Sequence, residues 1–420
     1  MKKVNNVEKK VLDCINTDEL IDYLCELISI PSITGEEKKA QDNIASKLSS
    51  IGMTVDQWDI DLDELSKHPD YSAEVERTDA VGVVGVWGED KGGKSLILNG
   101  HIDVVPSGDE SNWENPPWRG TINDGKIMGR GSVDMKGGLT CAIYAVKAIR
   151  EAGVKLKGQV IIESVIGEED GGIGALAATL RGYTADGAII MEPTELKIAP
   201  AQAGALCFRI KVHGLSAHAC VREEGVSALE KFIPIHNTLI ELEKQRNQRV
   251  DDPLYAGFEL PIPLNMGKVH CGNWPSTVPE SLVLEGRYGV AVDEDIEAAK
   301  REFIDALNRV VEADTWLCEH PPEMEWWGGQ FKPASVPVSD PIVETVMAAY
   351  EDTMGDSPIL EGVTYGSDMR HLVNVGKTPT LLFGPGDVRD CHKPNESVLI
   401  EDLLTTVKTL ALTILRFCEY

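Results

Sequence analysis

Residues 159–170 read QVIIESVIGEED, an apolar run that ends in three consecutive carboxylates. A short apolar run bounded by glycine predicts a strand that is buried on both faces, as in a parallel sheet. Helical patterns over 138–152 and 172–181 flank it, and strands that alternate with helices predict an α/β sheet covered by helices on both faces. Four further runs read as buried strands: 79–88 (DAVGVVGVWG), 95–100 (SLILNG), 186–191 (DGAIIM) and 378–384 (TPTLLFG).

The length of the chain, 420 residues, predicts two domains, because a single hydrophobic core rarely grows so large. Residues 206–327 read strand, helix, two strands, helix, strand, which is the βαββαβ order of a small ferredoxin-like domain. We therefore expect a discontinuous catalytic domain, 1–205 and 328–420, with an inserted domain over 206–327. Two helices over 17–52 are expected before the first strand.

Composition excludes several classes of partner. The net charge of −28 opposes binding to nucleic acid and to an anionic membrane surface. No apolar run reaches the roughly 18 residues of a membrane helix, and the polar first 20 residues do not resemble a secretory signal. Nine cysteines without a CxxC pair indicate reduced thiols, so we expect a cytoplasmic protein.

Metal-capable side chains follow four of the predicted strands directly. They are His101, the run Glu168-Glu169-Asp170, Glu192 and His392. Taken singly, each is better read as a hydrogen-bonded loop residue or a solvated acidic turn. Because the carboxyl ends of parallel strands face one crevice, however, these groups are expected to meet, and adjacent carboxylates in a partly desolvated cleft favour a bound cation.

Asp134 lies in the glycine-rich loop 129–138 (GRGSVDMKGG), which leads into a predicted helix. Such a loop could cradle a phosphate, but it has neither the Walker spacing nor GxGxxG. A tight backbone around an inward-facing carboxylate is the better interpretation.

Several motifs together resemble the zinc-dependent family that includes acetylornithine deacetylase, succinyl-diaminopimelate desuccinylase, aminoacylase and glutamate carboxypeptidase. The resemblance covers nearly the whole chain in order and spacing, including the inserted domain. The motifs are 100–106 (GHIDVVP), 113–117 (WENPP), 129–138, Glu168-Glu169, 191–194 (MEPT) and 384–386 (GPG) before His392.

The resemblance implies that Asp134 bridges two divalent metal ions. His101 and Glu192 would hold one ion, and Glu169 and His392 the other. Mixed nitrogen and oxygen donors suit zinc, with cobalt or manganese as possible substitutes. Two metals would acidify a water beside a polarised amide carbonyl.

The resemblance also implies roles for residues around the metals. Glu168 would act as the general base that takes the water proton and later gives it to the departing amine. Asp103 would orient the His101 imidazole. His218, from the inserted domain, would stabilise the oxyanion in the partner subunit of a homodimer formed through 206–327. Arg287 and Gly386 would bind the substrate, with a surface salt bridge as the competing interpretation of Arg287.

Three segments depart from the family pattern, and all face the expected substrate region. Residues 66–78 are longer than in compact members, Trp118 replaces a more usual Phe, and 273–279 is not a close copy of the loop that commonly precedes Val-Pro. These differences leave the implied ligands intact.

We therefore expect hydrolysis of a linear amide in a small N-acyl amino acid or N-acyl amine. The nearest alternative is a metallo-exopeptidase, either dipeptidase or carboxypeptidase, and a deformylase or carbamoyl amidohydrolase stays open within the same family. A catalytically dead binding homologue is disfavoured, because such descendants lose ligands or the base, whereas all five ligands and Glu168 are present here.

Overall fold

The computed structural model describes residues 4–89 and 91–420, which divide into two compact units. Unit 2 comprises Gln202–Pro333 and Val363–Gly366, and unit 1 runs up to Ala201 and resumes over Ala334–Gly362 and Ser367–Tyr420. The junctions at 202 and 333 lie a few residues outside the expected 206 and 327, because one long strand of unit 2 begins at Gly204 and another ends at Phe331. No helix in the described part of the chain is long and apolar enough to cross a membrane.

A six-stranded sheet forms the centre of unit 1, in the order β1-β2-β6-β3-β7-β14. The last four strands of this order pair in parallel, and β2 runs antiparallel to both of its neighbours. This confirms a mostly parallel sheet and all five predicted strands. The bounds are β1 Thr54–Asp59, β2 Val81–Gly88, β3 Leu96–His101, β6 Gln159–Val165, β7 Gly187–Ile190 and β14 Thr380–Leu382.

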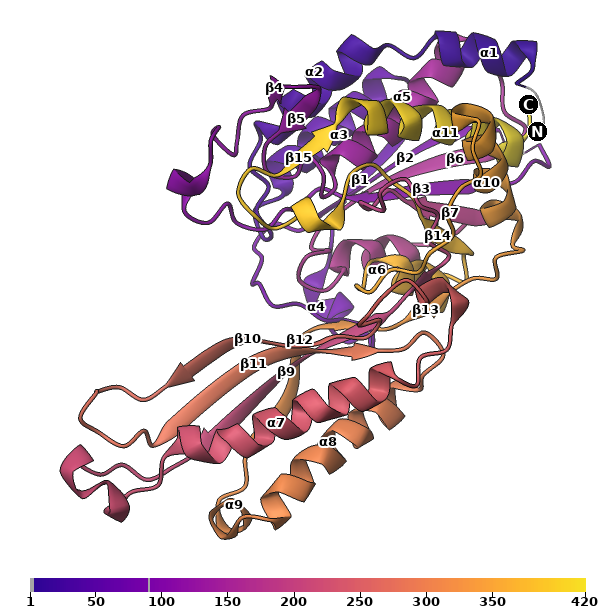
Figure 1. Ribbon diagram of the computed structural model, residues 1–420. Coiled ribbons are helices and arrows are strands. Elements are labelled where there is room, and N and C mark those ends of the chain that lie inside the picture. The colour runs from indigo at the N-terminus through magenta and orange to yellow at the C-terminus, as the bar shows by residue number, and fades with distance from the viewer. Residues whose placement is uncertain (1–3, 90) are drawn as a thin grey trace. The chain divides into compact units, whose positions relative to one another are not determined.

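Helices cover both faces of this sheet, as Figure 1 shows for α5 and α11 on one side and α6 on the other. Alternate residues of each strand face opposite layers. On the α6 side, Ile97, Ile161 and Val165 pack with helix residues such as Ala175. The helix bounds are α3 Lys38–Ser50, α5 Lys136–Glu151, α6 Ile173–Leu180, α10 Pro341–Met354 and α11 Ile400–Cys418.

The N-terminal part of unit 1 contains more structure than the sequence pattern predicts. Three helices precede the first strand instead of two, because α1 (Asn6–Asp13) packs on α11 and α5 in addition to α2 (Thr17–Ile28) and α3. Its N-terminus carries a capping box, in which Asn5 and Glu8 satisfy each other's backbone N–H groups. The smaller elements are α4 Leu62–Leu65 and strands β4 Thr121–Asn123, β5 Lys126–Met128 and β15 Ser397–Leu399, the last three forming a separate sheet.

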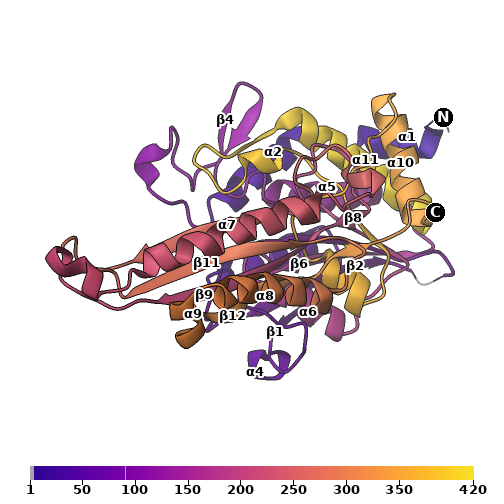
Figure 2. The same cartoon turned by 60° about the horizontal axis from the view of Figure 1, so that its bottom comes forward.

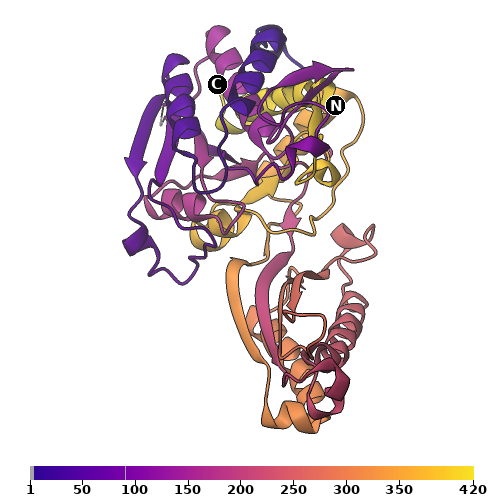
Figure 3. The same ribbon diagram turned by 90° about the vertical axis from the view of Figure 1, so that its left-hand side faces the viewer.

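Unit 2 confirms the predicted βαββαβ order. Its four-stranded antiparallel sheet has the order β10-β11-β9-β12, and α7 and α8 lie side by side on one face (Figures 2 and 3). The core between sheet and helices centres on Phe208 and Phe303, whose ring centroids lie 4.8 Å apart. The bounds are β9 Gly204–His213, α7 Ala228–Asn247, β10 Leu264–Cys271, β11 Ser281–Val290, α8 Ile296–Glu312, α9 Thr315–Glu319 and β12 Glu323–Phe331.

Candidate metal and catalytic site

The ends of three adjacent strands bring the predicted ligands of unit 1 together. His101 is the last residue of β3, Glu169 follows β6 by four residues, and Glu192 follows β7 by two. Because β6, β3 and β7 are neighbours in one parallel arrangement, their carboxyl ends share an edge of the sheet. Asp134 reaches the same edge from the loop that starts α5.

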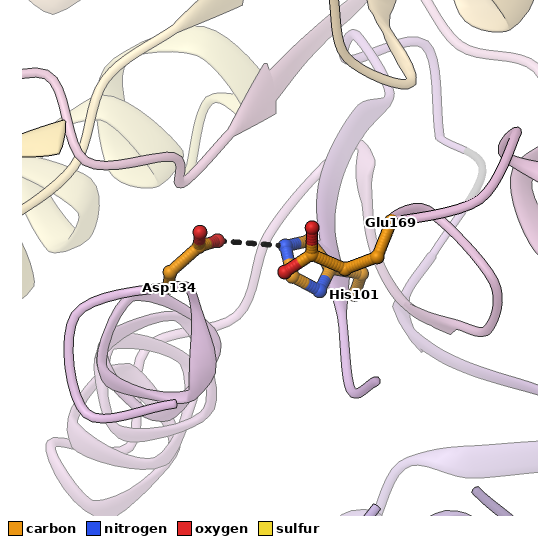
Figure 4. A group of neighbouring side chains, drawn as sticks. All are labelled: His101, Asp134 and Glu169. Carbon is orange, nitrogen blue, oxygen red and sulfur yellow. Dashed lines mark hydrogen bonds and ion pairs between the residues drawn. The ribbon is translucent and has the colours of Figure 1, made fainter. Parts of the chain in front are cut away.

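The first cluster of donors surrounds the His101 imidazole. Its Nε2 lies 3.0 Å from Oδ1 of Asp134 and 3.7 Å from Oε1 of Glu192. In Figure 4 the Asp134 carboxylate points at the ring nitrogen, and the Glu169 carboxylate lies beside the same ring. One donor atom from each of His101, Asp134 and Glu169 lies within 4.8 Å of the other two, which is close enough to hold one metal ion.

The second cluster surrounds His392. Its Nε2 lies 3.2 Å from Oδ2 of Asp134 and 3.0 Å from Oε2 of Glu169. The two oxygens of Asp134 therefore face two different imidazoles, one in each cluster. A carboxylate in this position can bridge two cations.

The charges at this site suit the binding of metal ions. Hydrogen bonds to Asp134 and Glu169 raise the pKa of His392 to about 10. Burial raises the pKa of Glu192 to about 8, with the charges of Asp134 and Glu169 adding to the effect. The buried carboxylates thus concentrate negative potential on the imidazoles, and a divalent cation can replace the protons that otherwise neutralise it.

Glu168 lies beside the first cluster and is buried. One of its oxygens falls within 4.8 Å of donor atoms from His101 and Glu192. Burial, and then the charge of Glu192, raise the pKa of Glu168 well above its usual range. A carboxyl group with a raised pKa next to the metal donors is suited to accept and return a proton.

Asp103 holds the backbone of the acidic run in place. Its Oδ1 accepts the N–H of Glu168 and its Oδ2 the N–H of Glu169, both at 3.2 Å. The His101 Nδ1 contacts the backbone carbonyl oxygen of Asp103 at 2.9 Å, whereas the nearest carboxylate oxygen lies 3.7 Å away. A carbonyl can only accept, so Nδ1 carries the proton and Nε2 is left to face a metal.

Comparison with known proteins identifies the family. The model of "Peptidase family M20/M25/M40" matches residues 97–416. The chain belongs to this family. Its members are metal-dependent hydrolases, and the chain is accordingly an amidohydrolase with a His, Asp and Glu cluster that can bind metal.

Two relatives with a named activity and one solved structure extend the comparison. The chain is 29% identical to the N-formyl-4-amino-5-aminomethyl-2-methylpyrimidine deformylase of Bacillus subtilis (strain 168), over 100% of this chain and 98% of that protein. It is 28% identical to the acetylornithine deacetylase of Pasteurella multocida, over 81% and 84% of the two chains. The fold matches the di-peptidase Dug1p from Saccharomyces cerevisiae with a TM-score of 0.79 at 15% identity, covering 98% and 99%.

Three further residues were predicted for the site of this M20/M25/M40 chain, one in unit 1 and two in unit 2. Gly386 follows β14 in unit 1 with a φ of 81°, a conformation that favours glycine. His218 and Arg287 belong to unit 2. His218 is exposed, and its Nδ1 accepts the backbone N–H of Cys220. Arg287 donates to the Thr364 carbonyl and forms no ion pair within the described residues, so the surface salt bridge considered for it is absent there.

One buried residue that supports the site was missed from sequence. Glu396 lies four residues after His392, and its Oε1 accepts the backbone N–H groups of Val133 (3.1 Å) and Asp134 (3.2 Å). Its Oε2 lies 2.5 Å from Arg130, which is also buried. Glu396 therefore connects the loop that carries Asp134 to the segment that carries His392. The signal that could have revealed Glu396 in the sequence is its position, only four residues after the predicted ligand His392.

Proposed function

We propose that the chain hydrolyses a linear amide in a small N-acyl amino acid or N-acyl amine, with Glu168 as general base. The observation that supports this most directly is Asp134, whose two oxygens face His101 and His392 respectively. That is the orientation that a ligand bridging two metal ions needs. The adjacent buried Glu168 supplies the proton acceptor that amide hydrolysis requires.

Two divalent cations, most simply zinc, with cobalt or manganese as substitutes, are proposed to occupy the clusters. The donors would be His101 and Glu192 at one ion, Glu169 and His392 at the other, and Asp134 at both. When bound, such ions polarise the amide carbonyl and lower the pKa of water. Metal analysis of protein purified with zinc tests this proposal, and about two ions per chain are expected.

The side chains of the site divide the remaining chemistry. Glu168 takes a proton from the attacking water, and the oxygen of that water forms a bond to the acyl carbon. As the C–N bond breaks, Glu168 returns the proton to the nitrogen, which gives a carboxylic acid and an amine. The acid then passes its remaining proton to the amine, so that the products at neutral pH are a carboxylate and an ammonium ion. Asp103 keeps Glu168 in place through the backbone N–H, and oxyanion stabilisation is assigned to His218.

A substrate panel separates the candidate reactions. The similarity to a formyl-pyrimidine deformylase and to acetylornithine deacetylase supports small N-formyl and N-acetyl compounds as first choices. N-formyl, N-acetyl, N-succinyl and N-carbamoyl compounds should be compared with dipeptides on metal-loaded enzyme. Cleavage of dipeptides alone would overturn the deacylase proposal in favour of an exopeptidase.

The role of Glu168 as general base has its own test. The Glu168→Gln variant should keep its metal bound, while its turnover should fall about 100-fold or more.

A homodimer formed through unit 2 completes the proposal. Its support is an apolar face on α7, where Leu229, Ile233 and Ile240 are exposed, and the strand β10, which among the described residues pairs on one side only, with β11. If His218 acts across the dimer, mixing inactive His218→Ala and Glu168→Gln chains should restore part of the activity. No recovery in the mixture would place the whole site in one chain.

A cytoplasmic location is proposed from the cysteines. All nine are free thiols, and two of them, Cys141 and Cys418, are buried. Free thiols in this number are typical of a reducing compartment.

A further inference from the structure

A surface segment covers the loop that carries Glu168. This acidic loop, residues 167–172, follows β6, and residues 70–77, here called the strap, form hydrogen bonds with it. The contact is close at Gly171, where a side-chain Cβ would lie 2.1 Å from the carbonyl oxygen of Ser72. The strap lies within residues 66–78, the segment that was expected from the sequence to be longer than in compact family members.

Asp170, the third carboxylate of the acidic loop, is the attachment point for the strap backbone. Its Oδ2 accepts the N–H of Glu74 at 3.1 Å and that of Val75 at 2.9 Å. Asp170 is buried, and the two residues that precede it, Glu168 and Glu169, are the predicted base and metal ligand. Its carboxylate therefore faces the strap.

Arg77 completes the attachment with both of its terminal nitrogens. Nη1 donates to Oδ2 of Asp170 at 2.9 Å and Nη2 to Oδ1 at 2.6 Å, and the side chains of Arg77 and Asp170 are only 1% and 4% exposed. Nη2 also donates to Glu37 at 3.3 Å. A bidentate guanidinium pair fixes both distance and orientation, which a lysine ammonium cannot do.

The acidic loop is thus held at its start and at Asp170. Asp103 accepts the N–H groups of Glu168 and Glu169, and Arg77 forms a bidentate ion pair with Asp170. Three consecutive carboxylates then have three tasks: proton transfer, metal ligation and anchoring. Moving the anchor would move the other two, because they share one short backbone.

We propose that Arg77 is a positioning residue for amide hydrolysis, setting the place of Glu168 and Glu169 through its bidentate pair with Asp170. This rests on the proposed function of Glu168. A displacement of about 1 Å at a reacting group can cost about 100-fold in rate, so a loosened strap should reduce turnover more than substrate binding. Loss of groups that orient metal ligands costs about 10-fold to 100-fold in activity or metal affinity.

The test compares Arg77→Lys and Arg77→Gln with a matched control. Arg181 also makes a bidentate pair, with Asp56, but on the exposed surface. Arg77→Gln should lower kcat by about 10-fold to 100-fold with KM changed less than about threefold, and Arg77→Lys should recover only part of the loss. Arg181→Gln should keep kcat within about twofold.

A second measurement needs no turnover. Cobalt-loaded wild type and Arg77→Lys should differ in their visible absorption, because the Glu169 ligand shifts with the loop, while cobalt-loaded Arg181→Gln should match wild type. If wild type cleaves no amide in the panel, the proposed function fails, and the cobalt spectra still decide the role of the strap. Wild-type kcat and an unchanged cobalt spectrum in both Arg77 variants would overturn the positioning role.

Discussion

Glu163→Gln should stabilise unit 1 at alkaline pH. Glu163 lies on β6 opposite Asn99 of β3, the strand that ends in His101. It is 1% exposed, one of its oxygens accepts from Asn99 at 3.0 Å, and the other has no hydrogen-bond partner within the described residues. Burial raises the pKa of Glu163 to about 7, and the charge of Asp368 adds to the effect.

The size of the effect follows from linkage. In the unfolded chain a glutamate has a pKa of about 4.3, so between that pH and 7 the folded state binds a proton that the unfolded state has lost. Stability therefore falls as pH rises through this window. The cost is about 1 kcal/mol at pH 5 and about 3.5 kcal/mol at pH 8. Glutamine keeps the shape and can still accept from Asn99, but it carries no charge.

Urea unfolding of metal-free wild type and Glu163→Gln at pH 5 and pH 8 measures this cost. The difference in the free energy of unfolding, variant minus wild type, should be about 2 to 3 kcal/mol larger at pH 8 than at pH 5. Glu259→Gln, at an exposed position, should show a difference from wild type that is independent of pH. A pH-independent difference for Glu163→Gln as well would refute the argument that Glu163 is buried with an unpaired oxygen.

Three other changes test the site and its scaffold. A chelator should abolish amide hydrolysis and added zinc or cobalt should restore it, measured as turnover before and after dialysis; full activity without metal would contradict the mechanism. Phe303→Ala should lower the free energy of unfolding of unit 2 by about 3–5 kcal/mol in urea, because a fully buried ring is lost. Gly138→Ala would place Cβ 2.2 Å from the Met191 carbonyl, next to Glu192, and should weaken metal binding in a competition titration; unchanged affinity would show that α5 can shift freely.

The parts of the fold that sequence predicts well are those with a local signal. The five apolar runs became buried strands, and the βαββαβ order of unit 2 followed from alternating patterns such as that of β9. Strand β1 was missed because its residues, TVDQWD, have no buried face, and only pairing with β2 defines it. Helix α1 was missed for a similar reason, since only Glu8 and Val11 are buried among its eight residues.

The acidic run at 168–170 shows where reasoning from sequence reaches its limit. Three adjacent carboxylates were expected to repel one another and so to require a cation. Two of them do face the metal donors, but the charge of Asp170 is compensated by Arg77, 93 residues earlier in the chain. No local pattern reports such a pair, because it depends on how the strap folds back over the loop. Counting the carboxylates in a motif therefore overestimates the negative charge that metal ions must neutralise. Which carboxylate binds metal and which anchors the loop is known only once the partner of each carboxylate is known.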